Sequence, residues 1–180
     1  MSLDPVIGIL LRSGFAILFA SAALHKWRDL RQFEAVFTAY ALLPAVPRLR
    51  LHWLVPALES LIALGLVAGA TYVYASIAGV ALLLSYAGAM ALNLLRGRRD
   101  IACGCGGPDE RRTLSAWMVW RNLLLALALS CAPLPWSRRV LLPTDWITIG
   151  FGVTAAVVIY LCADRLGQAL QNARALQGTR

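Results

Sequence analysis

Long apolar stretches separated by short polar segments dominate the pattern along the chain. A helix needs about 20 apolar residues to cross the hydrocarbon of a bilayer, and five stretches approach that length. They cover residues 6–24, 53–69, 72–95, 114–131 and 146–162. No intervening segment is long enough for a separate soluble domain. The pattern therefore predicts an all-α fold, in which residues 1–180 form one polytopic membrane bundle of four to five transmembrane helices.

The segment 25–52, between the first two spans, has a different pattern. Its apolar residues Phe33, Val36, Phe37 and Tyr40 recur at helical spacing and form one face, and the prolines of the run 43–47 then end the helix. We expect a short amphipathic helix in the membrane interface. Its role is either to cover the mouth of the bundle or to dock a partner.

The first span differs from a cleavable signal peptide. Such a peptide has a basic segment ahead of an uninterrupted apolar core. Here the residues before the core include Asp4 and no Lys or Arg, and Arg12 interrupts the core. We therefore expect this span to remain part of the bundle.

Composition supports a membrane protein and excludes several other classes. The 180 residues are 59% hydrophobic and 14% charged, with a mean hydropathy of +0.67, whereas soluble domains are about 45–50% apolar and about 25% charged. Although the net charge is +8, there is too little polar surface to build a basic face for nucleic acid. The four cysteines are too few for a disulfide-rich secreted scaffold.

The distribution of the basic residues predicts the orientation. Five follow the first span, five follow the third and three lie in the tail, while Arg138 and Arg139 alone fall on the opposite side. By the positive-inside rule, the N-terminus is expected outside, and the 96–113 loop and the C-terminus in the cytoplasm.

The loop 96–113 carries the strongest chemical signal. It contains Cys103-Gly104-Cys105 in a polar, glycine-rich setting flanked by arginines, and nearby positive charge lowers a thiol's pKa. A disulfide closing so small a ring is strained and therefore exchanges readily. Thiol–disulfide chemistry is the leading interpretation. Transient binding of a soft metal, which His25 or His52 could join, and an inert loop are the alternatives.

Ionisable residues inside the spans form the second signal, because a charge in the bilayer needs a partner or a water-filled cavity. Glu59 and Arg121 have nearly the same predicted depth, which suggests an ion pair with Asn122 and Asn93 as hydrogen-bonding partners. Arg12 either reaches Glu59 instead or points outward. The cluster is a structural tie between helices, or else a chamber serving the cysteines, a proton route or a quinone, the candidate cofactor.

Several stretches together resemble the methylamine utilisation protein MauE family, which is itself similar to the DoxX group of small redox-associated membrane proteins. They read LLRSGFAILFASAALHKW, FEAVFTAYALLP, DIACGCGGP and WRNLLLALAL, with a glutamate in the second span. The resemblance implies a bacterial inner-membrane protein that supports processing, transport or maturation of the disulfide-rich small subunit of periplasmic methylamine dehydrogenase. It also implies a thioredoxin-like periplasmic partner.

These observations lead to one functional hypothesis and two alternatives. The chain is predicted to be a membrane thiol–disulfide redox or maturation factor, with Cys103 and Cys105 exchanging electrons and Glu59, Arg121 and Asn122 shaping the chamber. The alternatives are a small transporter or soft-metal carrier that uses the same thiols, and a non-catalytic structural subunit. The client's disulfides form outside, whereas the basic residues predict a cytoplasmic cysteine loop. Either electrons cross the bundle, or the loop is re-entrant, or the orientation predicted from the basic residues is wrong.

Overall fold

The computed structural model describes residues 4–40, 51–98, 101, 114–134, 137 and 139–177, and within them every regular element is a helix. These elements are α1 (Pro5–Arg28), α2 (Leu30–Ala39), the 3₁₀ turn η2 (Leu51–Trp53), α3 (Leu54–Val67), α4 (Tyr72–Leu95), α5 (Ala116–Ser130) and α6 (Pro143–Gln177). The predicted all-α bundle is confirmed. The predicted amphipathic helix is also present, as α2, although the proline segment that was expected to end it lies outside the described residues.

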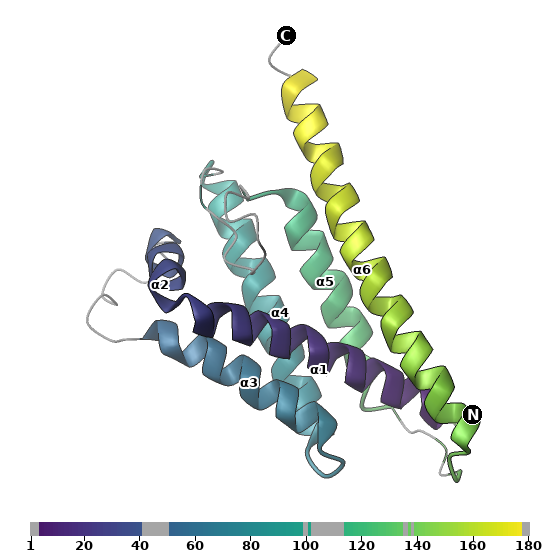
Figure 1. Cartoon of the computed structure of the whole chain (residues 1–180). Helices are drawn as coiled ribbons and strands as arrows, with labels where there is room; N and C mark the ends of the chain where they lie inside the picture. Colours follow the sequence, from purple (N-terminus) through teal and green to yellow (C-terminus); the bar gives the residue numbers. More distant parts are fainter. Residues whose placement is uncertain are drawn as a thin grey trace.

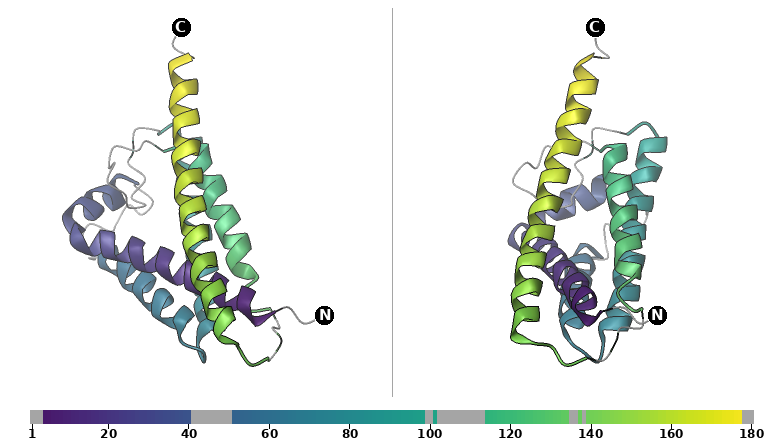
Figure 2. Two further views of the ribbon diagram at one scale, coloured as in Figure 1. Left: turned by 45° about the vertical axis from the view of Figure 1, so that its right-hand side comes forward. Right: turned by 90° about the vertical axis from the view of Figure 1, so that its right-hand side faces the viewer.

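Two antiparallel helix pairs make up most of the bundle. Helices α1 and α3 run side by side, as do α4 and α5, and the first pair is inclined to the second (Figure 1). Helix α6 crosses α1 near the N-terminal end of α1, and its C-terminal part extends beyond the other helices (Figure 2). We call the end of the bundle at which α4 ends and α5 begins the loop end.

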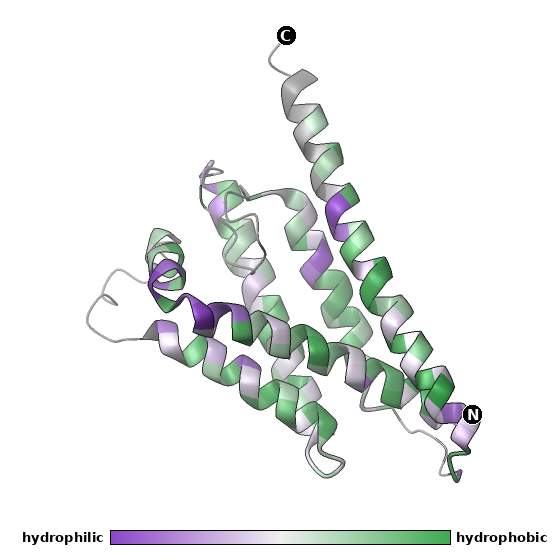
Figure 3. Ribbon diagram, viewed as in Figure 1, coloured by the Kyte–Doolittle hydropathy of each residue, from purple (hydrophilic) through white to green (hydrophobic). Residues whose placement is uncertain are grey.

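The helix lengths are those of a membrane protein. Helices α1, α4 and the Pro143–Gly167 part of α6 are long and apolar enough to span a bilayer. Helices α3 and α5 have 14 and 15 residues, which corresponds to about 21–23 Å at 1.5 Å per residue. Apolar residues cover most of the ribbon, and polar turns interrupt it at a few places (Figure 3). Many large apolar side chains face outward, Leu64 and Phe151 among them, as expected of a surface in contact with lipid.

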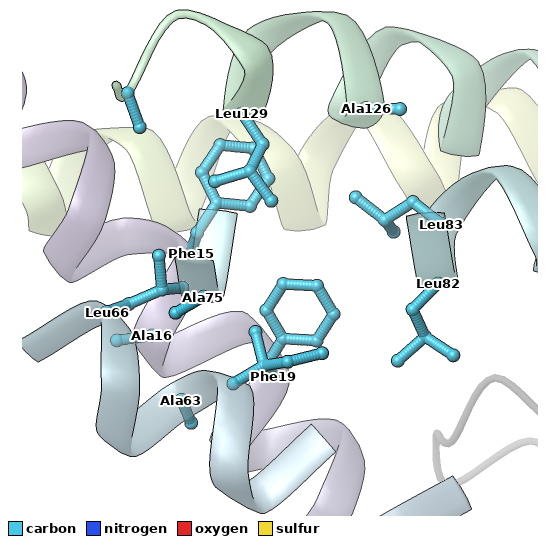
Figure 4. Close-up of a cluster of buried hydrophobic side chains, with 12 residues drawn as sticks. Phe15, Ala16, Phe19, Ala63, Leu66, Ala75, Leu82, Leu83, Ala126 and Leu129 are labelled. Atoms are coloured by element: carbon cyan, nitrogen blue, oxygen red, sulfur yellow. The ribbon is translucent and has the colours of Figure 1, made fainter. Parts of the chain in front are cut away.

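The core lies where α1, α3, α4 and α5 meet. Phe19 and Leu129 are fully buried there, with Phe15, Leu66 and Leu83 around them (Figure 4). Gly79 of α4 permits this close approach, because a Cβ at that position would lie 2.7 Å from Leu129 and 3.2 Å from Phe19. Small residues at helix crossings have the same effect in other membrane bundles.

An exposed polar cluster joins the N-terminus to the start of α6. Asp4 caps α1 by accepting a hydrogen bond from the Val6 amide at 2.9 Å, and its carboxylate also receives Arg139 Nε at 3.0 Å. Arg139 donates as well to Asp145 at 2.7 Å. The hydrogen bond from Arg139, together with that from Val6, lowers the pKa of Asp4 below its usual 3.8. This cluster holds the two helix starts together.

Candidate functional site

A buried ion pair joins α1 to α3. Lys26 Nζ lies 2.7 Å and 2.9 Å from the two carboxylate oxygens of Glu59, and the side chains are only 4% and 1% exposed. The Tyr86 hydroxyl of α4 donates a third hydrogen bond to Glu59 Oε1 at 2.8 Å. The ammonium also lies 5.5 Å from the centre of the Phe33 ring of α2. We call Lys26, Glu59 and Tyr86 the first polar cluster. It connects α1, α3 and α4, and Lys26 also contacts α2 through Phe33.

The local sequence explains why the first polar cluster is buried. Lys26 belongs to the last turn of α1, three residues before the helix is capped by Asp29, and Glu59 lies near the start of α3. Because α1 and α3 are antiparallel and adjacent, the end of one lies beside the start of the other. A buried charge that loses its partner costs about 3–5 kcal/mol, so each member of the pair needs the other.

A second ion pair joins α5 to α6. Arg121 Nη1 lies 2.7 Å from Asp164 Oδ1, and the side chains are 11% and 10% exposed. One turn earlier on α5, the indole of Trp117 packs against Gly167, which is one turn beyond Asp164 on α6. We call Trp117, Arg121, Asp164 and Gly167 the second polar cluster. Its two contacts lie one above the other along the two helices.

The predicted Glu59–Arg121 pair is therefore wrong. The prediction used depth along each helix axis, which does not determine which helices are neighbours, and the structure gives each of the two residues a partner on a different adjacent helix. Both partners lie just beyond the apolar stretches that were used to define the spans. Lys26 follows residues 6–24 and was counted among the loop charges, and Asp164 follows residues 146–162. Tyr86 was missed because an aromatic residue in an apolar span gives no polar signal.

The two asparagines also bond to groups other than those predicted. Asn93 Nδ2 donates to the Tyr40 carbonyl at 3.3 Å and to the Ala89 carbonyl at 3.1 Å, and thereby ties the end of α2 to α4. Asn122 Nδ2 donates to the Met118 carbonyl of its own helix at 2.8 Å. Both residues are buried. They serve as local polar groups satisfied by backbone carbonyls, not as partners of Glu59 or Arg121.

Arg12 lies at the other end of the bundle. Its guanidinium is 4.4 Å from the centre of the Tyr72 ring, at the first residue of α4, and its Nε donates to the Gly8 carbonyl at 3.2 Å. The expected alternative in which Arg12 reaches Glu59 is therefore not what the structure shows. A guanidinium over an aromatic face is stabilised by the ring quadrupole.

The cysteine loop begins and ends on one small apolar cluster. The Leu114 amide donates to the Ile101 carbonyl at 3.2 Å, and both side chains pack with Met90 and Met118. Tyr86, which bonds to Glu59, packs against the same cluster. Cys103 and Cys105 lie outside the described residues. The chain thus enters and leaves the cysteine segment beside the first polar cluster.

Of the two histidines considered as extra metal ligands, His25 directly precedes Lys26 in the chain and His52 belongs to η2. His52 Nδ1 is 3.9 Å from Glu34 Oε1, and its ring meets Trp53 edge to face. Tyr40, at the end of α2, packs against the apolar cluster at the base of the cysteine loop, and this burial raises its pKa to about 12. Within the described ranges, no three His, Cys, Asp or Glu side chains converge as metal ligands.

The fold and these clusters define a class of protein: an all-helical membrane bundle in which apolar helices are tied together by buried ion pairs. Comparison with known proteins gives the family. Residues 4–136 match the family described as Methylamine utilisation protein MauE, and the chain belongs to this family.

Individual relatives agree over nearly the whole chain. The chain is 38% identical to the methylamine utilization protein MauE of Paracoccus denitrificans, over 92% of this chain and 89% of that protein. It is 32% identical to the protein of the same name from Methylorubrum extorquens, over 94% and 91%. No solved structure matches. The resemblance predicted from the sequence is thus confirmed.

Proposed function

We propose that this chain acts in methylamine utilisation as a membrane thiol–disulfide exchange factor that supports maturation of a disulfide-rich client. The family and the names of its relatives support the pathway. Cys103 and Cys105 are the proposed redox pair, and a thioredoxin-like protein and the small subunit of methylamine dehydrogenase are the proposed partner and client. Both are expected on the periplasmic side of the inner membrane.

One observation carries the chemical part of the proposal: the anchoring of both ends of the cysteine loop. Ile101 and Leu114 are bonded to each other and packed on Met90 and Met118, and Cys103 follows Ile101 by only two residues. Two residues of chain reach at most about 7 Å, which limits how far Cys103 can lie from Ile101 and supports a redox site at the loop end. The first polar cluster fixes the helices there. We propose Glu59, Arg121 and Asn122 as positioning residues, which hold α3 and α5 in place around the loop.

The proposed exchange is a balanced two-step reaction. One loop thiolate attacks the partner's disulfide and forms a mixed disulfide, and the partner's other sulfur leaves as a thiolate that takes up a proton. The second loop thiolate then attacks the mixed disulfide, closes the Cys103–Cys105 bond and releases the partner as a dithiol. Two electrons pass from the loop to the partner. The reverse sequence transfers a disulfide from the loop to a client with two thiols.

Trapping the mixed disulfide tests this mechanism. In a chain carrying Cys131→Ser and Cys162→Ser, the further change Cys105→Ser removes the resolving thiol, and a covalent adduct with the thioredoxin-like protein should then accumulate on a non-reducing gel. The same chain with Cys103→Ser and Cys105→Ser is the matched control and should give no adduct. If this double variant supports growth on methylamine as well as the wild type, the redox proposal is wrong and the chain is a structural subunit.

The orientation is part of the proposal and has its own test. We propose the orientation that the loop's arginines predict, with the N-terminus outside and the cysteine loop and C-terminus cytoplasmic, because translocating those arginines is costly. Direct exchange with a periplasmic partner requires instead that the thiols are accessible from outside. With Cys103→Ser, Cys131→Ser and Cys162→Ser combined, Cys105 is the one remaining cysteine, and a membrane-impermeant maleimide should label it in opened vesicles and not in intact spheroplasts. Labelling in intact spheroplasts would place the thiols on the client's side and reverse the orientation predicted from charge. Labelling in opened vesicles alone would exclude direct exchange with a periplasmic partner.

A further inference from the structure

The unsatisfied polar atoms of the described residues belong to the N-cap and the first two turns of α5. Among the residues that the structure describes, three buried side-chain atoms have no hydrogen-bond partner: Ser115 Oγ, Trp117 Nε1 and Arg121 Nε. All three belong to the start of α5. A buried donor without an acceptor is unfavourable, and more so where no water is available. Such a set of donors in one helix segment calls for an oxygen atom that the described chain does not supply.

The geometry of the second polar cluster arranges these donors toward α6. Trp117 and Arg121 are four residues apart and therefore lie on one face of α5. That face meets α6, because Arg121 Nη1 bonds to Asp164 at 2.7 Å and the Trp117 indole fills the space left by Gly167. The indole nitrogen donates only, and so does the guanidinium. The missing ligand must therefore be an acceptor.

Charge decides which kind of acceptor fits. Arg121 is already neutralised by Asp164, so an anion would leave the cluster with a net negative charge inside an apolar bundle, which is unfavourable. A neutral carbonyl oxygen accepts the same hydrogen bonds without adding charge. Helix α6 also turns most of its surface outward, with Leu161 54% and Leu166 64% exposed. The ligand can therefore arrive from the lipid phase.

We propose that Trp117 and Arg121, at the seam between α5 and α6, bind a carbonyl oxygen of a neutral molecule dissolved in the membrane. Two sources supply that chemistry: the ring carbonyls of a quinone and the ester carbonyls of a phospholipid. The site does not depend on the thiol chemistry proposed above. A chain whose cysteines prove inert would still bind this ligand.

A single donor can be removed with little change of shape. Trp117→Phe keeps an aromatic ring beside Gly167 and deletes the indole N–H. Trp120→Phe is the matched control, because Trp120 is on the same helix but 63% exposed. Both variants are first compared with the wild type by far-UV circular dichroism and gel filtration in detergent. The intact chain is used throughout.

Titration with ubiquinone-1 tests the quinone source, and mass spectrometry of the purified protein measures retained phosphatidylethanolamine. For a quinone, we expect saturable binding of ubiquinone-1 that Trp117→Phe weakens about two- to tenfold, the equivalent of one hydrogen bond, and that Trp120→Phe leaves unchanged. For an ester carbonyl, the retained phospholipid should fall in Trp117→Phe alone. If Trp117→Phe and Trp120→Phe behave alike with both molecules, the site does not exist.

Discussion

The two buried ion pairs look alike in composition but differ in how completely their polar atoms are satisfied. Lys26 and Glu59 are almost inaccessible, and Tyr86 completes the carboxylate's bonding. Arg121 and Asp164 are slightly more exposed, and on Arg121 a buried Nε has no partner in the described chain. The first cluster is therefore closed and holds helices together, while the second retains the capacity to bind something else. For these two ion pairs, the presence of buried donors without a partner distinguishes a proposed binding site from a purely structural contact, whereas the presence of charge does not.

Removing the counter-charge of Lys26 should cause the largest loss of unfolding free energy. Glu59→Gln removes the counter-charge of an ammonium that is only 4% exposed, and we expect a loss of about 3–5 kcal/mol of unfolding free energy. Unfolding by SDS titration in mixed micelles, followed by circular dichroism, measures it. The double variant Lys26→Met with Glu59→Leu should recover most of the loss. A double variant as unstable as Glu59→Gln would show that charge isolation is not the cause.

Removing the counter-charge of Arg121 should cause a smaller loss of unfolding free energy. Asp164→Asn is the matching change at the second pair, but the Asn carbonyl still accepts from Arg121, and the site is slightly more exposed, so we expect about 2–3 kcal/mol. The same SDS titration applies, with Arg121→Met plus Asp164→Leu as the compensated control. An effect larger than that of Glu59→Gln would contradict the distinction between the two clusters.

Removing the third bond of the first cluster should have an intermediate to small effect. Tyr86→Phe deletes a hydrogen bond to a carboxylate, worth about 1.5 kcal/mol, and leaves the ring in place. Tyr74→Phe on the same helix is the control, because Tyr74 is 76% exposed and should tolerate the change. Equal stabilities of the two variants in the SDS titration would mean that Tyr86 adds nothing to the pair.

The exposed Asp4–Arg139 pair at the N-terminus should contribute least to the unfolding free energy. Its contribution requires a pH at which Asp4 is ionised. The folded-state pKa of Asp4 lies below its usual 3.8 because Arg139 donates to it, so its contribution is present above that value and is lost as pH falls through the folded pKa. Arg139→Gln should therefore lower stability slightly near neutral pH, and the difference from the wild type should shrink as the pH falls below 3.8 and through the folded pKa values of Asp4 and of Asp145, the second partner of Arg139. SDS titrations at neutral pH and over a series of pH values below 3.8 measure this. A loss that does not shrink over that series would exclude the ionised Asp4 and Asp145 as its source.

The positions of the helices were predicted from the sequence more accurately than the contacts between their side chains. The third span, 72–95, coincides with α4, and the helical face containing Phe33 and Phe37 lies on α2. Apolar runs underestimated α1 and α6, because hydrogen-bonded helix continues past the first charged residue while hydropathy does not. Lys26 and Asp164 were consequently missed as partners.

The prediction of a Glu59–Arg121 ion pair was wrong for a geometric reason. The rise per residue gives the depth of Glu59 and Arg121, but no periodicity tells which helix lies beside which. That depends on crossings such as the one at Gly79. The fold class and family were thus predictable from the sequence, whereas the ion-pair partners required the structure. The roles of Cys103 and Cys105 remain predictions.

The crossing at Gly79 also restricts how relatives of this chain can diverge. Any side chain added at position 79 would occupy space that Phe19 and Leu129 already fill. The three positions therefore share a fixed volume, and a larger residue at one requires a smaller residue at another. Across proteins that differ at about two-thirds of their positions, we expect substitutions here to occur together, as correlated changes on three separate helices.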